Sequence, residues 1–237
     1  MIQFYAPEIE CSLQLPEEEA RHCIKVLRTK PGSVIEVIDG KGNRYDCRLL
    51  SDDPRHASVE IVDKTPVTPA WSTYITVAVA PTKNMDRMEW LTEKLTEIGV
   101  NRIVPLLCRH SERKEIKIDR LQRIAVSAMK QSLKAMLPEI SPMTPLTKFI
   151  AKTDAEQRFI AYCDPSIPRR ILAKEYRAGC KSVAILIGPE GDFDPREIKD
   201  VLDSGYIPVT LGDNRLRTET AALVACDTFH ILNQLNS

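Results

Sequence analysis

Residues 183–193 read Val-Ala-Ile-Leu-Ile-Gly-Pro-Glu-Gly-Asp-Phe, and Pro195 follows two residues later. The run 183–187 is continuously apolar, which is typical of a strand buried on both faces of a parallel sheet. Gly188 and Gly191 then allow a tight turn, and Pro195 is suited to the first turn of a helix. This stretch therefore predicts a strand, a loop and a helix in succession, the unit from which α/β folds are built.

A second stretch repeats this order near the end of the chain. A short predicted strand ends at Leu211, the loop 212–217 reads Gly-Asp-Asn-Arg-Leu-Arg, and a helix is predicted over 218–235. Ligands of open parallel sheets bind outside the carboxyl ends of the strands, and helix starts offer unpaired N–H groups. We therefore expect the two loops to form one ligand site, although a turn is the simpler explanation of each glycine taken alone.

The rest of the chain divides into two parts with different patterns. From residue 74 onward, strands alternate with helices, which indicates a mostly parallel sheet covered on both faces. The strands are predicted at 74–80, 102–107, 159–162, 183–187 and 208–211, and the helices at 86–98, 119–136, 169–177, 195–204 and 218–235. The first part instead predicts a small β-barrel, with strands at 34–39, 45–50 and 57–62 and a helix at 16–27. The Pro/Thr-rich stretch 65–69 places the boundary, so the predicted domains are 1–68 and 69–237.

Charge and hydropathy limit the possible partners. The 237 residues contain 33 Lys+Arg and 33 Asp+Glu, so the chain as a whole is not a polycation. Residues 102–134 nevertheless carry nine basic residues against three acidic ones, which suits nucleic acid as well as a solvated face. The sequence has no apolar run of membrane-spanning length and no basic-then-apolar start. We expect a cytoplasmic protein with no membrane partner.

Several chemistries lack their sequence signatures. The seven cysteines and four histidines are dispersed, without C-x-x-C or H-E-x-x-H spacing, so reduced thiols and no metal site are expected. Neither loop has a phosphate-binding glycine pattern, and no local signature of a Ser/His/Asp or Cys/His site is present. A ligand held mainly by the backbone of two loops suits a nucleoside-like molecule better than a triphosphate.

The same stretches carry a resemblance to a known family. The two most specific motifs are Ile187-Gly188-Pro189-Glu190-Gly191 and Leu216-Arg217-Thr218-Glu219-Thr220-Ala221. Weaker matches are His22-x-x-x-Val26-Leu27-Arg28, Asp39-Gly40-x-Gly42, Lys83-x-x-Asp86-Arg87-Met88-x-Trp90, Lys94-x-Thr96-Glu97-Ile98-Gly99-Val100, Gln131-Ser132 and Pro138-Glu139-Ile140. On these motifs the chain resembles the RsmE family of the SPOUT superfamily, small-subunit ribosomal RNA methyltransferases that modify N3 of a uridine. It departs from the family pattern at Asp192 and Leu133, which replace glycines, and at His110, Lys134, Asn214 and Arg215.

The resemblance implies a PUA-like N-terminal β-barrel and a C-terminal trefoil-knotted α/β domain of the SPOUT type. It also implies S-adenosylmethionine as methyl donor, small-subunit ribosomal RNA as partner and a homodimer. The apolar start of the last helix could form the dimer face or, alternatively, pack into the core of the monomer. The cofactor-binding residues it suggests are Ile187, Gly188, Glu190, Gly191, Leu211, Gly212, Leu216, Arg217 and Thr218. The residues predicted to contact RNA are Arg21, His22, Arg28, Arg109, His110, Arg113, Lys114 and Lys134.

A methyl transfer to uracil N3 requires loss of the N3 proton. Arg217 is the candidate for stabilising the resulting anion at O2 or O4, and Glu190 or Glu219 is the candidate proton acceptor. Each acid also has a structural explanation, since Glu219 can cap its own helix and Glu190 can pin its loop. Three other functions stay open: a non-catalytic ribosome assembly factor, an enzyme of small nucleotides, and a SPOUT methyltransferase of another RNA or atom. Binding of the methyl donor separates the first of these from the enzymes.

Overall fold

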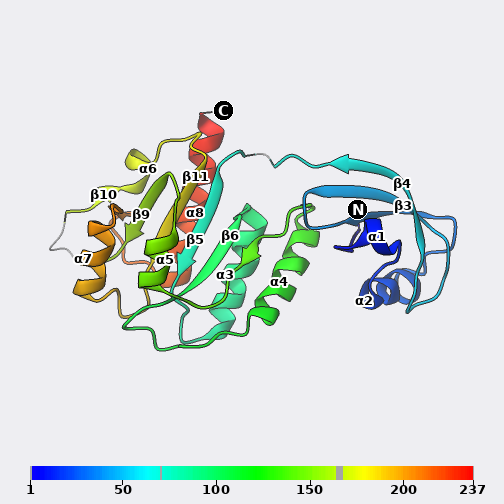
Figure 1. Cartoon of the computed structure of the whole chain (residues 1–237), viewed down its shortest axis with the longest axis horizontal. Helices are drawn as coiled ribbons and strands as arrows, with labels where there is room; N and C mark the ends of the chain where they lie inside the picture. The colour runs from blue at the N-terminus through cyan, green and yellow to red at the C-terminus, as the bar shows by residue number, and fades with distance from the viewer. Residues whose placement is uncertain (1, 70, 164–167, 237) are drawn as a thin grey trace. The chain divides into compact units, whose positions relative to one another are not determined.

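The computed structural model describes residues 2–69, 71–163 and 168–236 (Figure 1). The chain forms two compact units, one of Met1–Ala70 with Val126–Leu137, and one of Trp71–Ala125 with Pro138–Ser237. The sequence boundary at 68/69 lies next to the first crossing between the units, but residues 126–137 also belong to the first unit. They do so because Met129 and Ala135 pack with the fully buried Ile38 in one apolar cluster.

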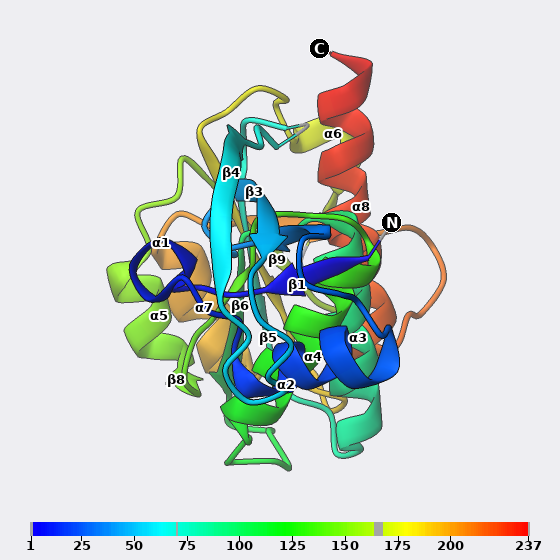
Figure 2. The same cartoon turned by 90° about the vertical axis from the view of Figure 1, so that its right-hand side faces the viewer.

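The first unit is built on a four-stranded sheet of order β1-β2-β3-β4 (Figure 2). The strands are β1 (Gln3–Tyr5), β2 (Val34–Ile38), β3 (Asn43–Leu49) and β4 (Val59–Pro66). Only β1 and β2 run parallel. The segment after β1 curls back to β4, since Leu15 N donates to Ala57 O at 3.0 Å and Val59 N donates to Leu13 O at 2.9 Å. These bonds continue the sheet around its core and fit the predicted barrel.

The helical part of this unit differs from the single predicted helix 16–27. Two short helices form, α1 (Ile9–Ser12) and α2 (Glu17–Arg21), and the second widens into the π-helical turn η1 (His22–Val26). Arg28 follows in the left-handed region with φ 56°. A π-helical turn and a non-glycine residue at positive φ are both unfavourable locally, and such features concentrate at functional sites.

The second unit contains one sheet of eight strands in the order β10-β12-β9-β11-β5-β6-β7, with β8 paired to β6, and every pairing is parallel. Its strands are β5 (Tyr74–Val79), β6 (Arg102–Leu107), β7 (Glu139–Ile140), β8 (Thr144–Pro145), β9 (Gln157–Ala161), β10 (Arg170–Ile171), β11 (Ser182–Ile187) and β12 (Ile207–Thr210). The prediction of a mostly parallel sheet is confirmed. In β11, Val183 and Ile185 pack into the core on one face, and Ala184 and Leu186 pack into the core on the other.

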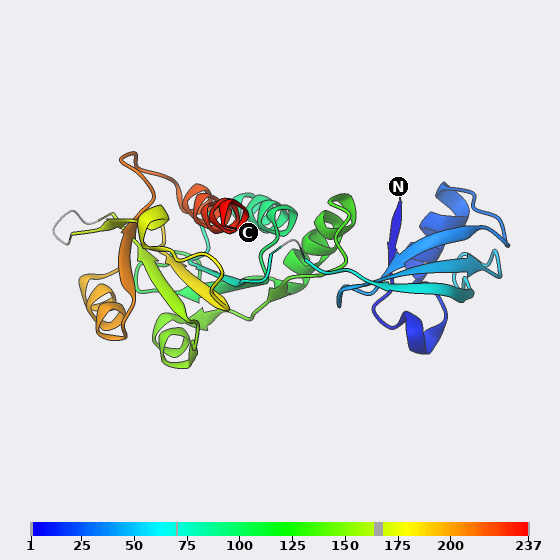
Figure 3. The same cartoon turned by 90° about the horizontal axis from the view of Figure 1, so that it is seen from above.

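Helices cover both faces of this sheet (Figure 3). On one side lie α3 (Met85–Ile98) and α8 (Thr218–Leu235), and on the other lie α5 (Leu146–Lys152) and α7 (Pro195–Asp203). The remaining helices are α4 (Ile118–Gln131) and α6 (Leu172–Glu175). Asn84 caps α3 by accepting from Asp86 N at 2.9 Å, and Gly99 ends it with φ 119°. A side chain at Gly99 would collide with the ring of Trp71, so this glycine is required by packing as well as by φ.

Two predicted helices are shorter in the structure. The helix expected over 119–136 ends at Gln131, because Leu133 takes φ 55°. The helix expected over 169–177 is reduced to α6 behind the two-residue strand β10. Within the described ranges, no helix is both long and apolar enough to cross a membrane.

Candidate functional site

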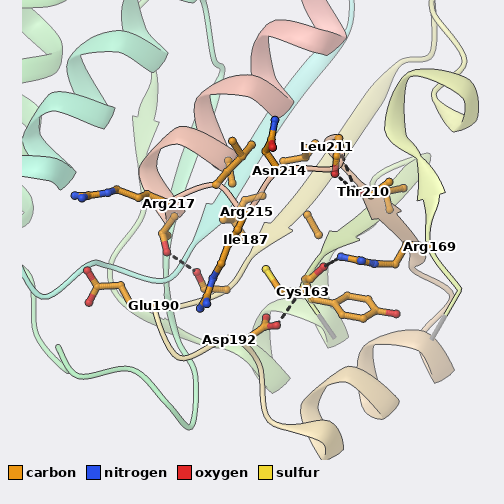
Figure 4. Close-up of a pocket in the computed structure, with 18 of the residues that line it drawn as sticks. Cys163, Arg169, Ile187, Glu190, Asp192, Thr210, Leu211, Asn214, Arg215 and Arg217 are labelled. Atoms are coloured by element: carbon orange, nitrogen blue, oxygen red, sulfur yellow. Dashed lines mark hydrogen bonds between the residues drawn. The ribbon is translucent and has the colours of Figure 1, made fainter. Parts of the chain in front are cut away.

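A pocket of about 1020 Å³ lies at the carboxyl ends of three neighbouring strands of the second unit (Figure 4). Strand β9 lies between β11 and β12, so the loops after those two strands start about 10 Å apart. The gap over the end of β9 is the pocket. It is lined by Arg87, 161–163, Pro168, Arg169, 187–190, Asp192, 209–218 and Ala221. The sequence-based expectation that the two glycine-bearing loops meet is confirmed.

The loop after β11, residues 188–193, is tied down on several sides. Thr218 Oγ1 donates to the carbonyl of Gly188 at 3.2 Å, which links this loop directly to the start of α8. Asp192 takes φ 61°, accepts from Cys163 N at 2.8 Å through one carboxylate oxygen, and accepts from Phe193 N at 2.9 Å through the other. The positive φ explains why glycine is usual at this position, and the short polar side chain of Asp tolerates it.

The helix that follows this loop begins with a capping box. The Asp194 side chain accepts from Arg196 N at 2.9 Å, and the Glu197 side chain accepts from Asp194 N at 3.0 Å. The hydrogen bond from Arg196 and the nearby Arg109 guanidinium hold the pKa of Asp194 below its usual value. The cap fixes the end of the loop that lines the pocket.

The loop after β12 has few such ties. Its residues Asp213, Asn214, Arg215 and Arg217 are exposed, and Gly212 takes φ 128°. The main polar contact at its start is Thr210 Oγ1 donating to Gly212 O at 2.8 Å. This loop lines the pocket with side chains that have few contacts within the described part of the chain.

A third segment of the pocket was missed from the sequence. Cys163 and Tyr162 follow β9, and Arg169 NH1 donates to Tyr162 O at 2.6 Å. The rule that ligands bind at carboxyl ends of strands applies to β9 as well, so the signal was present in the sequence. Figure 4 shows Cys163 and Arg169 on one side of the pocket, and Glu190 and Arg217 on the opposite side.

Arg87 of α3 is a further pocket residue that sequence reasoning noted in a motif but did not assign to the site. Its guanidinium lies 3.5 Å from Glu190 Oε1 and 3.6 Å from Glu219 Oε1. Glu190 lines the pocket, whereas Glu219 is buried and does not line it. The two acids predicted as catalytic therefore share one cation, and they differ in access to the pocket.

Most of the residues suggested for cofactor binding line the pocket. These are Ile187, Gly188, Glu190, Leu211, Gly212, Leu216, Arg217 and Thr218. Gly191 is outside the lining and lies against His110, where an added Cβ would be 3.4 Å from His110 Cβ. Among the residues that the structure describes, no group of three or more His, Cys, Asp or Glu side chains could hold a metal ion.

The residues predicted to contact RNA fall in both units. Arg21, His22, Arg28 and Lys134 belong to the first unit, and Arg109, His110, Arg113 and Lys114 belong to the second. In the second unit they lie in one segment, of which Arg109 and His110 contact the first pocket loop and its cap. His110 Nδ1 lies 3.1 Å from Asp192 O, and Arg109 NH1 lies 3.5 Å from Asp194 Oδ1.

In the first unit, Arg21, His22 and Arg28 lie in or next to the widened turn η1, whereas Lys134 lies in the segment 126–137. Arg21 pairs with Glu17 at 2.8 Å, and His22 packs edge-on against Phe4 with ring centroids 6.0 Å apart. These contacts engage Arg21 and His22 locally, whereas Arg28 extends from a left-handed, exposed position.

Family models match both units of the chain. A model of the RNA methyltransferase domain matches residues 69–230, and a model of the RNA methyltransferase PUA domain matches residues 15–62. The chain is thus an RNA methyltransferase by family, with a PUA-like N-terminal domain.

Individual relatives agree with these matches along almost the whole chain. Ribosomal RNA small subunit methyltransferase E of Aquifex aeolicus is 30% identical over 227 residues, which cover 93% of this chain and 95% of the relative. A crystal structure of a probable rRNA-methyltransferase from Porphyromonas gingivalis is 44% identical and covers 100% of both chains with a TM-score of 0.95. Ribosomal RNA small subunit methyltransferase E of Neisseria gonorrhoeae, solved bound to S-adenosyl methionine, is 30% identical and covers 98% of both chains with a TM-score of 0.85. The chain belongs to the ribosomal RNA small subunit methyltransferase E family, as its motifs predicted.

Proposed function

We propose that this protein transfers a methyl group from S-adenosylmethionine to N3 of a uridine in small-subunit ribosomal RNA. The observation that carries the proposal is that the two motif-bearing loops, at the ends of β11 and β12, line one and the same pocket. A related protein of known structure binds S-adenosyl methionine, which supports the same donor here.

The chemistry of the pocket fits this donor. Its volume is at the upper end of the roughly 300–1,000 Å³ typical of small-molecule sites. Ile187, Leu211 and Leu216 offer apolar surface suited to an adenine ring, and the exposed backbone near Gly212 allows close approach. The lining combines the acidic Glu190, Asp192 and Asp213 with the basic Arg87, Arg169, Arg215 and Arg217, a mixture that suits a donor carrying both a sulfonium and a carboxylate. When bound, S-adenosylmethionine supplies a methyl group on a positively charged sulfur as an activated electrophile.

The protein's own residues must activate the acceptor. We assign Arg217 to the developing negative charge on O2 or O4 of the uracil, since it lines the pocket and extends from an exposed loop. Of the two candidate proton acceptors, Glu190 is favoured over Glu219, because only Glu190 lines the pocket. The N3 atom lies on the pairing edge of the base, so the target uridine must be unpaired or flipped out to reach these side chains.

The contacts to RNA are assigned to the basic residues around the two loops and around η1. Arg109, His110, Arg113 and Lys114 follow β6, and the first two contact the first pocket loop and the cap that ends it, where they would meet the phosphates next to the target. Arg113 donates to Lys83 O at 2.8 Å, which holds this segment beside the start of α3. Arg21, His22, Arg28 and Lys134 provide the corresponding contacts in the first unit.

Three further features belong to the same proposal. We assign the protein to the cytoplasm, where ribosomal RNA is modified, and we propose that the end of the chain is threaded as a trefoil knot. We also propose a homodimer. The start of α8 does not supply its apolar face, because Ala222 and Ala225 are fully buried in the core of the second unit, so we assign the contact to the end of α8, where Ile231 and Leu235 are exposed one turn apart. Light scattering tests the dimer directly, and a monomer at micromolar concentration would contradict it.

The function is tested with the purified protein, S-adenosylmethionine and small-subunit particles from a strain that lacks the corresponding gene. We expect calorimetric binding of the donor, and we expect mass mapping to find one N3-methylated uridine after incubation. Arg217→Ala should reduce the transfer rate by about 10²–10³-fold while donor affinity is largely kept. Loss of donor binding in this variant would reassign Arg217 to the cofactor.

The open alternatives predict different results in the same experiment. A non-catalytic assembly factor binds the particle but has no need to bind the donor. An enzyme of small nucleotides methylates free nucleosides, and its activity would not fall steeply with salt. A methyltransferase of another RNA binds the donor but leaves the particle unmodified. True phosphate contacts weaken binding steeply as ionic strength rises.

A further inference from the structure

We infer that Arg87 is a positioning residue that fixes Glu190 at the pocket and is itself held in place by Glu219. The inference rests on the proposed function and goes further by giving the two acidic residues different tasks. Glu219 acts on the reaction only through Arg87, whereas Glu190 is the carboxylate that faces the reactants.

The three side chains come from three distant segments of the chain. Arg87 lies in the first turn of α3, Glu190 lies in the loop after β11, and Glu219 lies in the first turn of α8. The guanidinium uses its NH1 group toward Glu190 at 3.5 Å and its Nε group toward Glu219 at 3.6 Å. One planar group thus ties the first pocket loop to the helix that follows the second loop.

The position of Arg87 in its helix is unfavourable on its own. A cation in the first turn of a helix lies near the positive end of the helix dipole. Asn84 already caps α3, so the helix does not need the Arg87 side chain for capping. Two carboxylates around the guanidinium compensate this cost, and a carboxylate in the first turn of α8 is itself favourable. The charges of the site therefore explain the placement of Arg87, whereas the local stability of α3 does not.

Exposure separates the two carboxylates. The Glu190 side chain is 38% exposed, lines the pocket, and also accepts from Lys83 N at 3.5 Å. The Glu219 side chain is only 10% exposed, and its Oε2 atom has no hydrogen-bond partner in the described part of the chain. A buried carboxylate oxygen without a partner is costly, so a purely structural cap would be a poor use of this residue. Holding the guanidinium that orients Glu190 gives the buried charge a function.

The inference is first tested through the rate constant. Arg87→Ala should lower kcat for methylation of the unmodified particles by about 10²-fold, because a small misplacement of a reacting group has an effect of this size. Donor affinity, measured by calorimetry, should change much less than kcat. Guanidinium ion added at low, non-denaturing concentration should restore part of kcat, whereas methylammonium should not, because it cannot contact two carboxylates with one planar group. Arg170→Ala is the matched control, since Arg170 forms an ion pair with Glu175 at 3.0 Å and does not itself line the pocket.

A second measurement needs no substrate. Thermal unfolding of Arg87→Ala, Glu219→Gln and the double variant forms a double-mutant cycle. If Glu219 acts through Arg87, Glu219→Gln lowers the melting temperature of the unaltered protein but not that of Arg87→Ala, where it removes a buried carboxylate left without its partner. The same variants, assayed separately for kcat, should show no further loss from Glu219→Gln once Arg87 is absent. Arg87→Lys keeps the positive charge but lacks the planar guanidinium that contacts two carboxylates. It replaces Arg87→Ala in the cycle should the alanine variant fail to fold.

Three results would overturn the inference. The first is a kcat for Arg87→Ala equal to that of Arg170→Ala. The second is a double variant whose kcat is reduced by the product of the two single reductions, which would give Glu219 a role independent of Arg87. The third is a loss confined to donor affinity, with kcat unchanged. If the unaltered protein neither binds the donor nor methylates the particle, the proposed function fails instead, and the unfolding cycle still decides whether Arg87 and Glu219 act together.

Discussion

The two loops that enclose the pocket are built in opposite ways. The loop after β11 is anchored by Thr218, Cys163 and His110 and ends in a capped helix with the buried Phe193. The loop after β12 exposes most of its side chains and is anchored mainly at Gly212. One side of the pocket is therefore preformed, and the other is available to adjust when ligands bind. We expect changes in the first loop to affect ligand binding and the fold together, and changes in the second to affect ligand binding with little effect on the fold.

The largest effect should come from Gly188→Ala in the anchored loop. An added Cβ would lie 3.0 Å from two ring atoms of Phe193, which is only 4% exposed and must move. We expect a loss of stability of about 1–3 kcal/mol, as for other overpacked sites, together with weaker donor binding. Thermal unfolding and calorimetry measure the two losses. The double change with Phe193→Leu should recover part of both, and an unaltered melting temperature would contradict the idea of a rigid loop.

Gly212→Ala tests the second loop by a different mechanism. Nothing lies within 4 Å of the added Cβ, so only the backbone conformation at φ 128° opposes the substitution. Strained backbone of this kind costs about 1–3 kcal/mol, and an exposed loop should lie at the low end of that range. We expect a smaller drop in melting temperature than for Gly188→Ala. A larger drop would show that the second loop is the more constrained of the two.

Asp192 sharpens the comparison, because its backbone is in an unfavourable conformation while its side chain forms hydrogen bonds that hold the first loop in place. Asp192→Ala keeps the unfavourable φ of 61° and loses the acceptor for Cys163 N, so stability should fall by about 1 kcal/mol. Asp192→Gly loses the same bond but relieves the backbone, so it should be less harmful than alanine. Equal melting temperatures of the two variants would argue against strain at this position.

The smallest effect concerns pH. The pKa of Asp194 is lowered in the folded state by the hydrogen bond from Arg196 N, so its carboxylate stabilises the fold above its usual pKa of 3.8. This contribution is lost as the pH falls through the lowered value. Asp194→Asn keeps a capping oxygen without a titrating charge, so its melting temperature should fall less steeply in acid than that of the unaltered protein. Parallel curves of melting temperature against pH would contradict this assignment.

The sequence predicted the parts of the fold that depend on local pattern. The strand at 183–187 could be predicted because its side chains pack into an apolar core on each face of the sheet, which requires a continuous apolar run. The helix ending before Gly99 could be predicted because its apolar stripe and the glycine that follows it indicate the same end point. Strands of two residues, such as β7 and β10, have no pattern of their own and form only where a longer strand offers a partner.

The two loops of the site could be predicted from the sequence. The third segment of the pocket, after β9, and the ion pairs of Arg87 could not. That β9 separates β11 from β12 is a property of strand order, which joins residues far apart in sequence. The same holds for Arg87, which lies 103 residues from Glu190 along the chain. A motif indicates that such an arginine matters, but the identity of its partners follows only from the arrangement of the sheet.

The assignment of residues 126–137 to the N-terminal unit matters to anyone who wishes to isolate that unit. The chain crosses between the units at residues 70, 125 and 137, so severing the linker once does not yield two autonomous halves. A fragment that stops at the linker would leave Ile38 exposed to water, without Met129 and Ala135 against it. Gene fusions that exchange the N-terminal unit between homologues must therefore carry this internal insert along with it, or they will transplant an incomplete core.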